Sequence, residues 1–165
     1  MIQHLSIIAL AMLSTLTVAA QKPNTKHCFK LNTETDLFDG SSTTTMGGLK
    51  YQMSMLTFHK HVAKGDTTLM VGATLTAQGY ETDPGMIFLF DDGSRLEIPE
   101  STHKASAASY GWNHVGIGVI TEEELQQFAE KSVKAFRLGR YDQETPGKAG
   151  KSVSMTSAYC LANHR

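Results

Sequence analysis

The sequence lacks the features that would assign it to several common functional classes. It has no cluster of more than two Lys or Arg residues, and its 15 basic side chains nearly balance its 16 acidic ones. A nucleic-acid-binding protein needs a concentrated positive patch, so we expect no nucleic acid as a partner. A G-x-S-x-G motif, which would place a catalytic serine, is also missing. The sequence therefore favours a non-catalytic protein, and it predicts no cofactor.

The first twenty residues contain no charged side chain, and Leu5 to Val18 form an apolar run. This run is too short to cross a bilayer, which needs about 20 apolar residues, and the small residues before Gln21 suit a signal peptidase. We expect residues 1–20 to be a signal peptide. The mature chain, residues 21–165, is then an exported, periplasmic or extracellular domain without a membrane span. The alternative is a buried N-terminal helix.

Cysteine is scarce, with Cys28 near one end of the mature chain and Cys160 near the other. No C-x-x-C pair accompanies either residue, which argues against a metal site built on cysteine. Exported proteins form and keep disulfides, so we expect one bridge between these two residues. Two unpaired thiols are the alternative.

Alternating apolar and polar residues dominate the middle of the chain. The clearest run extends from Leu69 to Ala77, and a period of two is typical of a half-buried β-strand. Further strands are expected at 43–46, 49–55, 86–90, 95–98, 111–120 and 133–141. About seven strands predict a mainly β fold, a single antiparallel β-sandwich, with a small barrel as the alternative.

Helix signals are few. Thr121 and Glu124 have the spacing of a capping box, which predicts a short helix before the last strand. Residues 151–162 fit a helical stripe or a strand, and we favour the helix. Residues 101–109 and 142–150 are expected to be loops. Gly116 and Gly118 share one face of their strand, which predicts close packing of another element rather than a phosphate-binding loop.

The order of these elements resembles a group of uncharacterised, exported, single-domain proteins of Gram-negative gut and oral bacteria. The resemblance extends from Glu34 to Ala162 and departs from the group after Tyr141, where a Gly/Pro/Lys loop replaces a tight turn. It implies a β-sandwich without an established activity and transfers no site residue. The segments that carry it are FDDGS at 90–94, VITEEEL at 119–125, KSVKAFR at 131–137, and Cys160.

His59 and His61 form the candidate metal site of the sequence. Residues two apart on a strand point to the same side, so one ion could contact both imidazoles. A zinc site needs a third ligand, and no spacing selects among the available residues, which are His103, His114, Asp66 and Glu81. The alternative is that both histidines lie at the solvated end of a strand without a metal.

Trp112 is the candidate ligand-contact residue, with a buried position in the sandwich as the alternative. Two functions follow from these observations. The first is a binding or structural module of the envelope or secreted fraction, whose partner is an unknown protein, glycan or envelope component. The second is a metal-binding protein or metal-dependent enzyme that uses His59 and His61.

Overall fold

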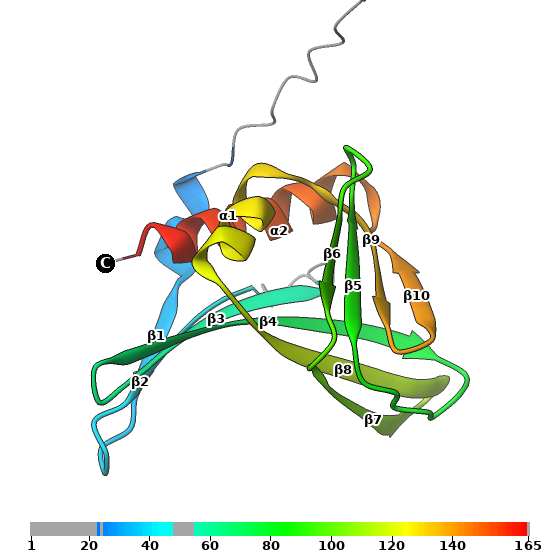
Figure 1. The fold of residues 1–165 in the computed structure, drawn as a ribbon, viewed down its shortest axis with the longest axis horizontal. Helices are drawn as coiled ribbons and strands as arrows, with labels where there is room; N and C mark the ends of the chain where they lie inside the picture. Colours follow the sequence, from blue (N-terminus) through cyan, green and yellow to red (C-terminus); the bar gives the residue numbers. More distant parts are fainter. Residues whose placement is uncertain (1–22, 24, 48–54, 165) are drawn as a thin grey trace, which may run out of the picture.

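The computed structural model describes residue 23 and residues 25–47 and 55–164 (Figure 1). The predicted signal peptide and the predicted strand at 49–55, apart from Met55, lie outside these described residues. Within them the chain forms these elements: η1 (Thr25–Lys30), β1 (Asn32–Thr35), β2 (Ser42–Gly47), β3 (Leu56–Ala63), β4 (Asp66–Ala77), β5 (Met86–Phe90), β6 (Arg95–Ile98), β7 (Thr102–Ala108), β8 (Gly111–Ile120), α1 (Glu122–Glu130), β9 (Val133–Leu138), β10 (Tyr141–Glu144) and α2 (Gly147–Ala162).

Two antiparallel sheets make up the β structure of the described residues. The large sheet has the strand order β1-β2-β3-β4-β8-β7, and the small sheet has the order β10-β9-β5-β6. The predicted mainly β, antiparallel and sandwich-like fold is therefore confirmed. The described residues contain ten strands, more than the seven or so expected.

Besides β3, which begins directly after the expected strand at 49–55, the additional strands are edge strands. Residues 101–109 and 142–150 were expected to be loops, but they contain β7 and β10, and β1 lies in the polar segment before the first expected strand. Each of the three has a neighbour on one side only. Most of their side chains are exposed, so no apolar alternation marks them in the sequence.

The small sheet stands over the β8 end of the large sheet, and α1 and α2 lie over the remainder (Figure 1). Period-two alternation supplies the inner face of the large sheet, where Leu69, Val71, Ala73 and Leu75 of β4 are buried. The rings of Phe58 (β3), Phe88 and Phe90 (β5) all lie within 5.5 Å of the ring of Phe128 on α1. One aromatic side chain thus connects both sheets to the helical layer.

Both predicted helices are present. The Thr121 amide donates to the Glu124 carboxylate, and the Glu124 amide donates to the Thr121 hydroxyl, so the predicted capping box starts α1. Residues 151–162 are helical, as favoured, and α2 begins earlier, at Gly147.

Gly116 and Gly118 allow the two sheets to approach each other. A Cβ atom at Gly116 would lie 2.7 Å from Leu138 Cδ2, and one at Gly118 would lie 2.6 Å from Ile98 Cγ2. Both contacts are with side chains of the small sheet. The predicted close packing against this glycine pair is therefore confirmed.

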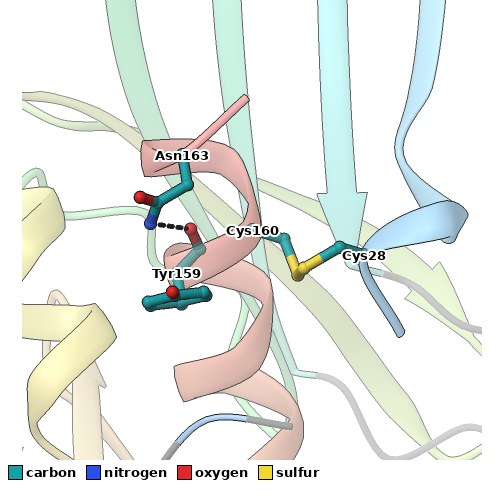
Figure 2. The surroundings of a disulfide bond; sticks show 4 residues. All are labelled: Cys28, Tyr159, Cys160 and Asn163. Atoms are coloured by element: carbon teal, nitrogen blue, oxygen red, sulfur yellow. Dashed lines mark hydrogen bonds between the residues drawn. A yellow bond between two sulfur atoms is a disulfide. The ribbon is translucent and has the colours of Figure 1, made fainter. Parts of the chain in front are cut away.

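The predicted bridge between Cys28 and Cys160 is present and joins η1 to the last turns of α2 (Figure 2). It spans 132 residues, and the Cα atoms lie 5.1 Å apart. Cys160 is buried and Cys28 is half-buried. The disulfide therefore fixes the start of the described chain against its last helix.

Candidate functional site

His59 and His61 lie on the outer face of the large sheet, the face turned away from the core. His59 Nδ1 is 3.0 Å from the Thr45 hydroxyl, and His59 Nε2 is 3.1 Å from the Thr57 hydroxyl. His61 Nδ1 is 3.0 Å from the Thr43 hydroxyl. Both rings lie on the same side of β3, as predicted. Hydroxyl groups of threonines on β2 and β3 are within hydrogen-bond distance of both rings.

Within the described part of the chain, no third metal ligand lies beside these histidines. No three His, Cys, Asp or Glu residues converge as a metal site among the residues with described positions. The candidates His103 and His114 lie on the inner side of the large sheet, where His114 pairs in register with the inward-facing Leu75. A metal site at His59 and His61 therefore stays a prediction.

Replacing His59 and His61 together with Ala is expected to change the free energy of unfolding by at most about 1 kcal/mol, because water replaces the rings as partners of the threonines. Burial lowers the pKa of His59, so this ring stays neutral at neutral pH. The neutral His59 ring therefore favours the folded state above pH 6.5, the usual pKa of histidine. This contribution to stability is lost as the pH falls below that value. Denaturant unfolding and elemental analysis check the prediction. Stoichiometric zinc in the wild type that is absent from the double variant would contradict it.

Trp112 is half-buried at the start of β8. Its ring centroid lies 5.7 Å from that of Tyr80, which is 67% exposed. The tryptophan is therefore neither a fully buried core residue nor a fully exposed one. Its role as a ligand contact stays a prediction.

A shallow depression of about 400 Å³ lies on the outer face of the small sheet. Ile87 and Leu89 contribute apolar side chains, and Arg95 and Arg137 contribute charge. Each arginine already contacts a carboxylate, Glu97 for Arg95 and Asp142 for Arg137. The depression therefore offers no uncompensated positive charge to an anionic ligand.

The hairpin between β1 and β2 carries the most exposed large apolar side chains of the described residues. Leu37 is 94% exposed and Phe38 is 101% exposed. The hairpin projects away from the rest of the fold, at the lower left of Figure 1. We call Asp36 to Ser41, the residues at its end, the hairpin tip.

Hydrogen bonds fix the conformation of the hairpin tip. The Phe38 amide donates to the Asp36 carboxylate at 2.7 Å, and the Ser41 amide donates to the Asp39 carboxylate at 2.8 Å. The Gly40 amide donates to the Asp36 carbonyl, and Gly40 has a φ of 71°, which glycine adopts without strain. The tip thus holds Leu37 and Phe38 in solvent on an ordered turn.

The hairpin tip is acidic. From Leu31 to Gly47 the charged side chains are Glu34, Asp36 and Asp39, with no Lys or Arg. Hydrogen bonds from Ser41 hold the pKa of Asp39 below its usual value, and the nearby His61 adds to this effect. At the same end of the sheet, Lys64 lies in the turn after β3, and Asp66 is the first residue of β4. Leu37 and Phe38 therefore have acidic residues on both sides of them in the chain.

Leu37 and Phe38 are not among the candidate residues from the sequence, because they lie in a polar segment without apolar alternation before the expected strand at 43–46. A signal was present in the segment DLFDG at 36–40. Asp and Gly are typical turn residues, and two large apolar residues between them have no neighbouring apolar partners to pack against. Such a pattern indicates an exposed apolar turn.

Comparison of the chain with protein-family models, with curated proteins and with solved structures finds no match in any of the three. The resemblance to exported proteins of Gram-negative bacteria therefore stays a prediction. None of the helices in the described part of the chain is long and apolar enough to span a membrane.

Proposed function

We propose that this chain is an exported, non-catalytic binding module that inserts Leu37 and Phe38 into an apolar pocket of a protein partner. The observation that carries the proposal is the nearly complete exposure of both side chains on a turn held by hydrogen bonds. Full burial of one such side chain contributes about 1.5–3 kcal/mol. Both side chains remain in water in the isolated fold, so burial in a partner's pocket would contribute this free energy to binding.

The ordered turn favours affinity because binding need not first restrict the conformation of the loop. The Asp36 and Asp39 carboxylates accept backbone hydrogen bonds within the hairpin tip, so the turn has its shape before any partner arrives. Large aromatic side chains are also common among the residues that contribute most to binding. Phe38 is therefore the expected anchor, with Leu37 beside it.

The charge of the hairpin tip indicates the kind of partner. Glu34, Asp36 and Asp39 would face the rim of a pocket that receives Phe38, so a rim of Lys and Arg would be complementary. An anionic lipid surface would repel the same three carboxylates. A protein with a basic rim around an apolar pocket therefore suits the tip better than a membrane does.

We also propose that the chain is exported from the cytosol. The uncharged apolar run at the start of the chain is typical of a signal peptide, and disulfides persist outside the cytosol. The Cys28–Cys160 bridge is compatible with a periplasmic or extracellular position. We infer that the partner is another protein of that compartment or its boundary.

Site-specific photocrosslinking in the producing cells tests the proposal. A photoreactive phenylalanine at position 38 of the full chain is expected to form an adduct with a discrete protein. With that protein purified, Phe38→Ser is expected to weaken binding about 30-fold, which corresponds to about 2 kcal/mol for an anchoring aromatic. Higher salt should weaken the wild-type complex by screening the acidic tip.

Tyr110 supplies a matched control, because it is an exposed aromatic residue, 87% accessible, in the turn at the opposite end of the large sheet. The photoreactive residue at 110 should give no such adduct, and Tyr110→Ser should leave the affinity unchanged. Equal adducts from both positions, adducts with lipid alone, or unchanged affinity of Phe38→Ser would overturn the proposal.

A further inference from the structure

His103 of β7 and His114 of β8 form one continuous chain of hydrogen bonds between two backbone carbonyls. His103 Nδ1 lies 2.8 Å from the Asp83 carbonyl oxygen, and His114 Nε2 lies 2.8 Å from the Gly79 carbonyl oxygen. Between them, His103 Nε2 is 2.9 Å from His114 Nδ1. Both carbonyls belong to the β4–β5 connection, residues 78–85.

The number of protons in this chain follows from the chemistry of its ends. A carbonyl oxygen only accepts, so His103 Nδ1 and His114 Nε2 must each carry a proton. A neutral imidazole carries one proton, so two neutral rings would bring two lone pairs together at 2.9 Å. One additional proton between the rings turns this repulsion into an N–H···N hydrogen bond. With that proton the arrangement would hold three protons and one net positive charge.

We propose that His103 and His114 share this extra proton and act as a pH-sensitive clasp that holds the β4–β5 connection against the large sheet. The clasp would depend on pH because it holds one proton more than two neutral rings do. Loss of the shared proton removes the bond between the rings and leaves each histidine with its own carbonyl. This proposal does not depend on the hairpin tip or on the proposed partner.

The surroundings supply compensating negative charge. His114 is fully buried, and the ring of Tyr141 on β10 lies 4.5 Å from it. The Tyr141 hydroxyl donates to the Glu81 carboxylate. This hydrogen bond lowers the pKa of Glu81, and the charges of Arg140 and His114 lower it further. Glu81 therefore remains ionised beside the histidine pair.

The other charged groups near the pair compensate each other or point away. Arg140, in the turn between β9 and β10, lies 3.1 Å from the Asp83 carboxylate and 3.7 Å from that of Glu81. Lys104 follows His103 on β7 and therefore faces the opposite side of the sheet. Glu81 is thus the carboxylate placed to offset the shared proton.

The clasp connects the two sheets at one end of the fold. The connection it holds carries Asp83, which binds Arg140 of the small sheet, and Tyr80, which packs on Trp112. Gly139 lies against the same point, because a Cβ there would be 2.8 Å from the Asp83 carbonyl. Opening the clasp would therefore loosen the contact between the β7–β8 edge and the small sheet.

The direction of the pH effect follows from the proton count. The clasped arrangement binds one proton more than two neutral rings do, so it is stabilised at the acidic side of the histidine range and lost as the pH rises. A second extra proton would place two N–H groups face to face, so the clasp also fails at still lower pH. Buried His59 acts in the opposite sense, since its pKa is lowered. The Asp and Glu residues with lowered pKa titrate below about pH 4.5.

Comparison of the wild type with His103→Ala isolates the pair, because His59 and the carboxylates are present in both proteins. Raising the pH from about 6 to about 8 should lower the denaturant midpoint of the wild type relative to that of the variant. Hydrogen-exchange protection of amides 78–85 should fall over the same range in the wild type alone. His103 is half-exposed, so the variant should fold.

Ring-nitrogen NMR gives a readout that a merely structural role would not produce. In the wild type at about pH 6, three of the four ring nitrogens of the pair should carry protons. His164→Ala, which removes a histidine at the far end of the chain, should keep this behaviour. Two neutral rings at that pH, or the same pH dependence in wild type and His103→Ala, would overturn the proposal.

Discussion

Loss of the Cys28–Cys160 disulfide is expected to lower the free energy of unfolding by about 5 kcal/mol. The bridge closes a loop over a separation of 132 residues. In the unfolded chain such a cross-link removes a large amount of conformational entropy, and this term grows with loop length. Because a domain is typically stable by about 5–15 kcal/mol, the loss would be a large fraction of the total.

Denaturant unfolding of the wild type with and without a thiol reductant measures this effect. The oxidised and reduced proteins have the same side chains, so differences in packing volume do not enter the comparison. The Cys28→Ala/Cys160→Ala variant should resemble the reduced wild type in midpoint and should not respond to reductant. An unchanged midpoint after complete reduction of the wild type would contradict the expectation.

Replacing Gly118 with Val is expected to cost about 3 kcal/mol, because the new side chain would enter the contact between the sheets. A Cβ atom there would lie 2.6 Å from Ile98 Cγ2, 2.9 Å from Met86 Cε and 3.3 Å from Ser101 Cβ. The Ile98 methyl is attached directly to a β-branched carbon and has little freedom to move. Overpacking must therefore shift the small sheet relative to β8.

The sign of the Gly118 effect separates packing from backbone preference. Valine favours strands and glycine disfavours them, so the backbone alone would predict a gain of up to about 1 kcal/mol. Val119→Thr on the exposed outer face of the same strand is the control, with an expected change within about 0.5 kcal/mol. Denaturant unfolding of both variants decides, and a Gly118→Val protein as stable as the wild type would refute the close approach.

Sequence reasoning succeeded where a feature depends on neighbouring residues. The Thr121–Glu124 capping box starts a helix because both hydrogen bonds form within one turn. The alternation from Leu69 to Ala77 predicts both the strand and its buried face. The disulfide was also predicted, although its support came from the expected export and the small number of cysteines rather than from local geometry.

The candidate metal site shows what sequence reasoning could predict from spacing and what it could not. Spacing correctly placed His59 and His61 on one side of their strand, facing the threonines that hold them. Spacing could not show that His103 and His114 lie on the other side of the sheet, because that depends on the register of β7 and β8 with β4. The histidine pair itself joins residues of two strands to carbonyls of a third segment, and no motif encodes it.

The sequence by itself determined the mainly β class, the inner faces of the central strands and the capped helix. It also determined the glycine face of β8, against which another element packs closely. Each of these depends on periodicity or on hydrogen bonds between close neighbours in the chain. The tertiary structure alone decided the edge strands β1, β7 and β10, whose partners are backbone groups of adjacent strands rather than buried side chains of their own. It also decided that Leu37 and Phe38 stay in solvent, because burial depends on which distant surfaces reach a side chain, and none of the described residues covers these two.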